Sequence, residues 1–369
     1  QYLGREDKEN SNRAARQVLI SALALALLVM GVCLGLRAQL LDLIFGTVEP
    51  AVMQAAQTYF FFTAFSYPFI ALFNASAALY RASGNTRLPM VVSAGCNCLN
   101  VAGNAVLMFG FHLGVAGAAI STLCSYIVAA AVMLALQQRP GQKSEVGKLT
   151  AMRPDWKVIL LVLRIGLPTG VEDAMFQFGK LVVQSTVSTL GTTAIAANAI
   201  VTVLEYFSSM PSTAIGTGLM TVAGQCIGAG NPDEARANTK KLTIWSAVVL
   251  LAANWLIFAL TFPVTRLAGL DAAAAHMTIQ VMLVISIVKP FLWPLASTPS
   301  NGMRAAGDVK FGMIVSSISM WVFRVGLTTV LCRFLGVGLI GIWCGYFADW
   351  FVRSIVFTLR YRSGKWLEH

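Results

Sequence analysis

Charged residues are scarce in this sequence. Asp, Glu, Lys and Arg together make up 12% of its 369 residues, whereas soluble globular proteins contain about 25%. Hydrophobic residues make up 57%, and a chain of this composition cannot cover itself with a polar surface. We therefore exclude the two or three soluble domains that the length alone would suggest, and we predict a protein whose main solvent is lipid.

Motifs of catalytic and metal sites are missing as well. The sequence contains no HExxH, GxSxG or Walker motif and only three histidines. Its seven cysteines form no CxxC pair, so we read them as small core residues rather than as disulfides or zinc ligands. We expect no enzyme, no cofactor and no transition-metal site, and we keep an intramembrane enzyme only as the weakest alternative.

The basic residues are dispersed rather than clustered. Although the net charge is +11, the 27 Lys and Arg residues form no stripe or patch, so we expect no nucleic-acid partner. Nineteen of them fall in loops on the side of the visible N-terminus and three in the opposite loops. Because cytoplasmic loops are enriched in Lys and Arg, both visible ends are predicted to be cytoplasmic.

Apolar stretches long enough to cross a bilayer as helices recur along the chain. They do not show the alternation that is typical of β-barrel strands, so the predicted fold is all-α and polytopic. We predict ten spans, at residues 16–36, 50–80, 87–110, 114–137, 158–190, 192–228, 237–264, 273–304, 310–333 and 337–360.

The two parts of the chain repeat each other. Residues 1–4 (Gln-Tyr-Leu-Gly) match residues 225–228 (Gln-Cys-Ile-Gly), and residues 80–87 match residues 303–310. Farther along, Leu-Gly-Val at 113–115 matches the same three residues at 335–337. Transporters are often built from two such halves, so the repeat predicts two six-helix lobes.

The earlier lobe is expected to be incomplete. Two helices precede Gln225 in the later copy and none precedes Gln1, which predicts a native protein of twelve spans whose first two are absent here. The expected organisation is an incomplete N-lobe at 1–137, a cytoplasmic linker at 138–157, a C-lobe at 158–366 and a tag scar at 367–369.

Seven short motifs, each weak alone, are specific in their order and spacing. They are Gln1-Tyr-Leu-Gly4, Arg81-Ala-x-Gly84-Asn-Thr-Arg-x-Pro89, Asn100-x-x-x-Asn104, Gly114-Val-Ala-Gly-Ala-Ala119-x-x-Thr122, Gly166-Leu-Pro168, Ala194-Ile-Ala-Ala-Asn198 and Val222-Ala-Gly-Gln225-Cys-Ile-Gly-Ala-Gly230-Asn-Pro-Asp-Glu. In these motifs the chain resembles the multidrug and toxic compound extrusion (MATE) transporters, of the multidrug/oligosaccharidyl-lipid/polysaccharide exporter superfamily. The resemblance extends to about residue 360.

This resemblance implies two six-helix lobes around a central cleft. It also implies a secondary active antiporter that exports organic, cationic or amphipathic compounds (drugs, toxins or metabolites) in exchange for Na⁺ or H⁺. The expected partners are a small-molecule substrate, a monovalent cation and the lipid bilayer, for a monomer in a bacterial-type cytoplasmic (inner) membrane. In many members an acidic residue on the first helix of the N-lobe is central to coupling, and that helix is absent from this chain.

Asn100 and Asn104 are the candidate cation ligands of the N-lobe. Their i, i+4 spacing places two amide oxygens on one helix face, and hard cations prefer oxygen ligands. In the family the second position is often Asp, so Asn104 makes a proton relay there doubtful. Thr122 resembles a residue that completes the ion site in some members. The alternative is that the asparagines only hydrogen-bond neighbouring helices.

Three acidic residues in predicted spans are the candidate coupling residues of the C-lobe, because acids inside a membrane are costly and mark functional sites. Asp173, Gln177 and Lys180 share one helix face, so Lys180 is expected to neutralise Asp173 and to leave Glu172 as the less compensated acid. Glu205 precedes Pro211, which frees a backbone carbonyl and invites local unwinding.

The remaining candidates concern the cleft. Three prolines in span 273–304 predict a bent or broken helix that also carries Lys289, an internal counterion for coupling or a side chain that reaches the interface. We expect an Asp349–Arg353 helix pair, and Arg324, alone in its span, needs a partner. The expected substrate cleft comprises Phe176, Gln177, Lys180, Tyr206, Met210, Lys289 and Trp293. Lipid-facing or core packing is the alternative for its aromatic residues and Met210.

A lipid-linked sugar flippase of the same superfamily is the main alternative function. A flippase for anionic headgroups should line its cleft with unpaired basic residues. Here the buried basic residues Lys180, Lys289 and Arg324 are expected to be matched by Glu172, Asp173 and Glu205.

Overall fold

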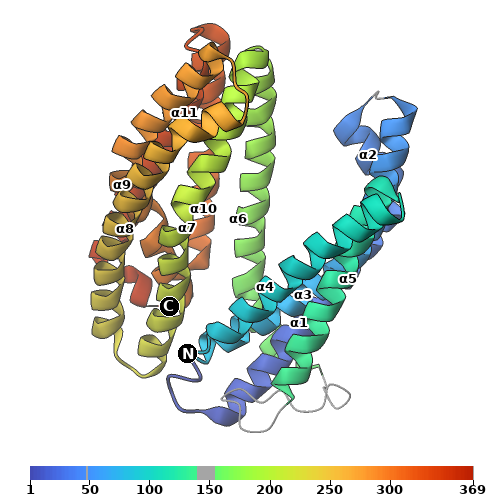
Figure 1. Cartoon of the computed structure of the whole chain (residues 1–369). Coiled ribbons are helices and arrows are strands. Elements are labelled where there is room, and N and C mark those ends of the chain that lie inside the picture. Colours follow the sequence, from blue (N-terminus) through green and yellow to red (C-terminus); the bar gives the residue numbers. More distant parts are fainter. Residues whose placement is uncertain (47–48, 139–153, 369) are drawn as a thin grey trace. The chain divides into compact units, whose positions relative to one another are not determined.

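The computed structural model describes residues 1–46, 49–138 and 154–368 (Figure 1). These residues form helices joined by short turns and contain no β-strand. The chain separates into two compact units. The N-unit contains Tyr2 and Glu6–Leu163, and the C-unit contains Gln1, Leu3–Arg5 and the chain from Arg164 onward.

Four long helices and two short ones build the N-unit. They are α1 (Lys8–Gly35), α2 (Arg37–Phe45), α3 (Pro50–Ala82), α4 (Arg87–Asn104), the π-helical turn η1 (Ala105–Gly110) and α5 (Gly114–Gln137). The side chain of Asp7 accepts a hydrogen bond from the backbone N–H of Asn10 at 3.0 Å and so caps α1. Pro50 begins α3, at the position where a missing N–H costs nothing.

The C-unit consists of six long helical segments and one short turn. They are α6 (Trp156–Ser188), α7 (Thr192–Gly228), α8 (Pro232–Leu267), α9 (Ala272–Ala306), α10 (Val309–Ser319) continued by the π-helical turns η3 (Met320–Leu327) and η4 (Val330–Phe334), α11 (Leu339–Ser363) and η5 (Lys365–Leu367). The first residues of α6 belong to the N-unit. The long helices α7, α8 and α9 run side by side (Figure 1).

Nine helices of the described residues are long and apolar enough to cross a membrane. They correspond to nine of the ten predicted spans, and the tenth, 158–190, is α6. This helix is 33 residues long, but charged side chains interrupt its apolar sequence. Large apolar side chains are exposed on the helices, for example Leu28 (64%) and Leu256 (63%), as expected where lipid is the solvent.

The repeat is visible in the turns that follow α3 and α9. Gly84 and Gly307, 223 positions apart, both adopt positive φ, 83° and 98°. The residue after each glycine donates a backbone hydrogen bond of 3.0 Å to a carbonyl five residues back, Tyr80 or Met303. This C-terminal cap needs a left-handed residue, which explains why glycine occupies both positions.

The predicted linker at 138–157 lies largely outside the described residues. Its last residues are described, and Asp155 pairs with Arg13 of α1 within the N-unit. The backbone N–H of Asp155 also donates to Oε1 of Gln17, at 3.0 Å. The start of α6 is therefore attached to α1.

Of the predicted bend or break at the prolines of span 273–304, the break does not occur. Helix α9 is continuous from Ala272 to Ala306 through Pro290, Pro294 and Pro299, and α7 continues through Pro211. Side chains from α7, α9 and α11 form the main core of the C-unit, with Val183 and Val187 of α6 packed into it. Packing against neighbouring helices thus holds the proline-containing segments helical.

Gly345 of α11 allows a close approach to η3. A Cβ atom at this position would lie 2.1 Å from Oγ1 of Thr328 and 3.0 Å from the backbone oxygen of Arg324. We expect Gly345→Ala to destabilise the protein by about 1–3 kcal/mol, because an overpacked core must shift backbone. The measurement is the thermal unfolding midpoint in detergent. Gly218→Ala is the matched control, since nothing lies within 4 Å of its added methyl group. Equal midpoints for the two variants would contradict the close approach.

Candidate functional site

A buried ammonium group sits in a cage of oxygen atoms inside the C-unit. Nζ of Lys289 lies 2.5 Å from Oε1 of Glu205 and 3.1 Å from the backbone oxygen of the same residue. It also lies 2.5 Å from Oγ of Ser209 and 3.2 Å from Oγ of Ser208. A lysine ammonium group can donate three hydrogen bonds, so the four oxygen atoms around it exceed its number of donors by one.

Helix geometry assembles all four oxygen atoms of the cage on one helix. Glu205, Ser208 and Ser209 are spaced i, i+3, i+4 on α7, so they face the same neighbour. Both serine hydroxyls donate to the backbone oxygen of Glu205, and Ser209 also donates to its carboxylate at 2.9 Å. Lys289 approaches from α9. Glu205 and Lys289 were predicted from the sequence and the two serines were not, although the i, i+3, i+4 spacing of Glu205, Ser208 and Ser209 indicates one shared helix face.

The two charges of the cage differ in exposure. The side chain of Lys289 is fully buried, whereas 20% of the Glu205 side chain is exposed. The ring of Trp350 lies on another side of the ammonium, with 5.9 Å between Nζ and the ring centroid. A buried ammonium needs a compensating charge, and the partly exposed carboxylate of Glu205 supplies it.

Glu172 is not the uncompensated acid that the sequence suggested. Its carboxylate is 3% exposed and lies 2.8 Å from Nη2 of Arg304, at the end of α9. The expectation was wrong because it weighed only the charges on the same helix, whereas Arg304 belongs to α9, which packs in the same unit.

The predicted polar stripe lies on a face of α6 that is about 100° around the helix from Glu172. Asp173, Gln177 and Lys180 are all exposed on the C-unit. Within the described residues no ion pair joins Asp173 to Lys180, so Lys180 acts on this carboxylate electrostatically without a direct contact. On the neighbouring face, Glu172 is buried and Phe176 is half-buried.

The residues expected to line a substrate cleft differ in their exposure. Tyr206 and Met210 of α7 are 64% and 42% exposed. Lys289 is fully buried in the cage, Trp293 packs edge-to-face on Trp350 at 5.4 Å, and Phe176 lies under guanidinium groups. The sequence identified the aromatic residues on each helix, but it does not determine whether they face the interior or the surface of the helix bundle.

A second buried charge cluster contains the partner that Arg324 was missing. Arg324 pairs with Asp349, whose carboxylate also accepts a hydrogen bond from Oγ of Ser319 at 2.6 Å. The expected pair of Asp349 with Arg353 is not formed: Arg353 donates to the backbone oxygen of Ala296 at 3.3 Å. Both guanidinium groups lie over the ring of Phe176, at 5.4 and 5.2 Å.

In the N-unit the three predicted ligands lie together. Nδ2 of Asn100 donates to Oγ1 of Thr122 at 3.1 Å, and Nδ2 of Asn104 donates to Oδ1 of Asn100 at 3.2 Å. Oδ1 of Asn104 is buried and accepts no hydrogen bond from the described residues. The π-helical turn η1 begins directly after Asn104, and such turns are frequent at functional sites.

Taken separately, the two units contain different kinds of oxygen site. The N-unit has neutral amide and hydroxyl oxygens, of which Oδ1 of Asn104 is available. The C-unit has a carboxylate that is already occupied by an internal cation, Lys289. Oxygen atoms of both kinds are suited to hard monovalent cations, and the carboxylate also to a proton.

Comparison with known proteins places this chain in a family. The family model MatE matches residues 1–106 and 168–330, more than half of the chain. A probable multidrug resistance protein NorM from Thermotoga maritima is 28% identical over 79% of this chain and 63% of its own length. The uncharacterized transporter YisQ from Bacillus subtilis is 29% identical over 81% of this chain and 66% of its own length. The chain thus spans about two thirds or less of these relatives.

Solved structures share the fold. A MATE protein in complex with MaL6 superposes with a TM-score of 0.90 at 19% identity, over 99% of this chain and 82% of the other. An outward-facing multidrug resistance MATE transporter gives 0.89 at 19% identity, over the same shares. The family match, together with the apolar helical fold, shows that this chain belongs to the MatE family of MATE membrane transporters.

Proposed function

We propose that the protein containing this chain is a secondary antiporter that exports organic, cationic or amphipathic compounds in exchange for Na⁺ or H⁺. The observation that carries the proposal is the oxygen cage in which Glu205 is neutralised by Lys289. Relatives named for multidrug resistance support the class of substrate. We place the protein as a monomer in a bacterial-type cytoplasmic membrane, with its linker on the cytoplasmic side.

In the proposed mechanism, an external cation and Lys289 compete for the same carboxylate. When Na⁺ or H⁺ neutralises Glu205, the buried ammonium loses its counter-charge, so the conformation that buries Lys289 becomes less stable. A cation can shift the equilibrium between two conformations of the transporter only if it binds one of them more tightly than the other. Competition with Lys289 for Glu205 would provide this difference in affinity. The conformational change itself is proposed to be a rocking of two repeat-related lobes, as in other transporters built from repeats.

Asn100, Asn104 and Thr122 are proposed as a second, neutral cation site. The unpaired Oδ1 of Asn104 supports this role, because a buried oxygen without a donor can accept a cation at little desolvation cost. Asp173, with no described basic group in ion-pair distance, is proposed to contribute to binding of a cationic substrate or ion.

The test is transport by the full-length protein in liposomes, with a Na⁺ gradient and a pH gradient imposed separately. We expect dye efflux that requires one of the two gradients, together with substrate-dependent ion flux and no chemical change of the substrate. Efflux that is independent of both gradients would refute antiport.

A lipid-linked sugar flippase is the second candidate. One observation favours it: Lys180 is exposed and makes no ion pair with a described acidic residue, as a site for anionic headgroups requires. The same liposomes discriminate the two, because a flippase would move a lipid-linked sugar between leaflets and leave cationic dyes in place.

A further inference from the structure

A basic groove opens at one end of the C-unit, away from the cage of Lys289. It has a volume of about 450 Å³ and is formed by α8, α9 and α11. Its cationic residues are Arg236 and Lys240 of α8 and Arg362 of α11. The other lining residues are neutral: Thr239, Thr243, Ile244, Leu295, Pro299, Thr358 and Tyr361.

The three cations of the groove are not neutralised. Within the part of the chain that the structure describes, Arg236, Lys240 and Arg362 form no ion pair. The neighbouring carboxylate of Asp308 is already paired with Arg360, at 2.9 Å. Three positive charges around a groove without an acidic lining residue favour an anionic occupant.

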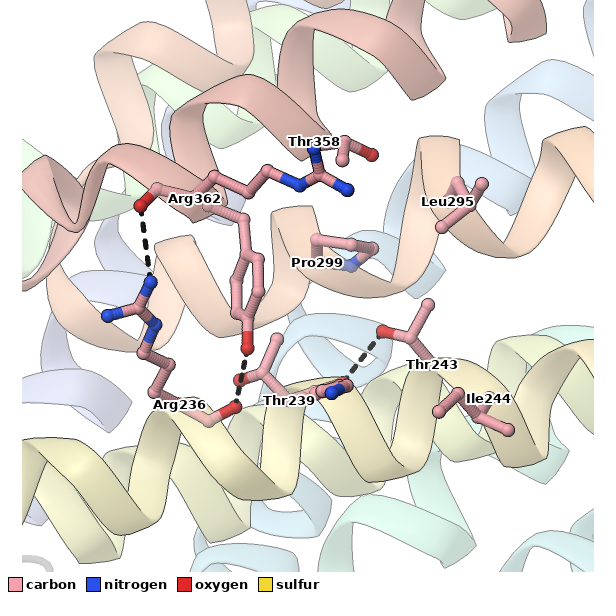
Figure 2. A pocket seen from close by; sticks show the side chains of 10 residues that line it. Arg236, Thr239, Thr243, Ile244, Leu295, Pro299, Thr358 and Arg362 are labelled. Carbon is pink, nitrogen blue, oxygen red and sulfur yellow. Dashed lines mark hydrogen bonds between the residues drawn. The ribbon is translucent and has the colours of Figure 1, made fainter.

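Reciprocal bonds between α8 and α11 hold the groove in shape. Nη2 of Arg236 donates to the backbone oxygen of Arg362 at 3.1 Å, and the hydroxyl of Tyr361 donates to the backbone oxygen of Arg236 at 3.0 Å. Figure 2 shows these bonds and places the guanidinium of Arg362 beside Thr358, at a distance from that of Arg236. The two arginines thus present donors at separate points of the groove.

Apolar surface continues from the groove along all three helices. On α8, Ile244 and Val248 are 55% and 52% exposed, and on α9 Leu295 is followed one turn away by Phe291, 67% exposed. On α11, Ile355 (43%) lies one turn from Thr358 of the groove. An inorganic anion would not bury these apolar surfaces, whereas the acyl chains of a lipid would cover them.

We propose that this groove binds the headgroup of an anionic phospholipid, with the positive charges of Arg236, Lys240 and Arg362 distributed along it and the acyl chains along α8, α9 and α11. Basic pockets between membrane helices are a recognised way to hold such headgroups, and the position of the groove at a basic helix end fits the headgroup level. This site does not depend on the transport cycle proposed above.

The experiment is native mass spectrometry of the full-length protein with phosphatidylglycerol or phosphatidylcholine of identical acyl chains. The double variant Lys240→Gln/Arg362→Gln is compared with Lys241→Gln/Lys310→Gln, which removes two exposed charges outside the groove. We expect the groove variant to retain roughly 25-fold less phosphatidylglycerol than the wild type, since each of the two basic residues it removes adds roughly fivefold in affinity for an anionic headgroup. The control variant should retain as much phosphatidylglycerol as the wild type. All three proteins should retain the same amount of phosphatidylcholine.

The single variant Lys240→Gln and the soluble probe inorganic phosphate complete the test of the lipid site. Lys240→Gln alone should reduce retention by roughly fivefold, and it removes no hydrogen bond or ion pair among the described residues, so folding is not at risk. Equal retention by the groove variant and the control would overturn the proposal. So would thermal stabilisation by inorganic phosphate without any preference for phosphatidylglycerol, since the groove would then be a site for soluble phosphate.

Discussion

Glu205→Gln is expected to abolish ion-coupled transport and to destabilise the protein by about 3 kcal/mol, because it leaves the buried ammonium of Lys289 without a charged partner. The figure is at the lower end for a broken buried pair, since the serine hydroxyls and the amide oxygen still accept hydrogen bonds from Nζ. The measurements are dye efflux from liposomes and the thermal unfolding midpoint of the full-length protein.

A compensating variant separates stability from function. In Glu205→Gln/Lys289→Met no charge remains in the cage, so stability should return to within about 1 kcal/mol of the wild type. Transport should stay lost, because neither the carboxylate nor its competitor is present. Efflux of Glu205→Gln at the wild-type rate would exclude the carboxylate from coupling, whatever its effect on stability.

Asp349→Asn is expected to cost about 3–5 kcal/mol, because Arg324 is 5% exposed and would keep a buried, unpaired charge. The substitution also weakens the acceptor for Oγ of Ser319. The measurement is again the thermal unfolding midpoint, read at equal detergent concentration.

Two control variants test whether the loss of stability in Asp349→Asn comes from the unpaired charge of Arg324. Replacing the pair by apolar residues, Arg324→Met/Asp349→Leu, should recover most of the stability, since removing both charges removes the desolvation cost. Asp155→Asn should have a much smaller effect, because its partner Arg13 is 55% exposed and solvent screens the pair. A loss for Asp349→Asn no larger than that for Asp155→Asn would show that Arg324 does not depend on this carboxylate.

Local patterns allowed much of the candidate site to be predicted. The i, i+4 spacing of Asn100 and Asn104 put both on one face, and they are hydrogen-bonded there. The spacing of Asp173, Gln177 and Lys180 likewise placed all three on one exposed face. These predictions concern residues within one or two turns, where helical periodicity alone fixes the geometry. What these residues bind remains a prediction.

Pairings between helices were predicted less well. Lys289 joins Glu205 across 84 positions, Arg304 joins Glu172, and Asp349 joins Arg324 rather than its own helix neighbour Arg353. Choosing among several acids and bases requires the relative height and rotation of the packed helices. Periodicity within one helix does not contain that information.

Composition and repetition determined that this protein is a helical membrane protein with matching turns at Gly84 and Gly307, because hydrophobic burial and backbone conformation are properties of short segments. Only the tertiary structure decided which charges neutralise one another and which remain free in the groove of Arg236, Lys240 and Arg362. The physical reason is distance: ion pairs form over a few ångströms between side chains that packing, not sequence proximity, brings together.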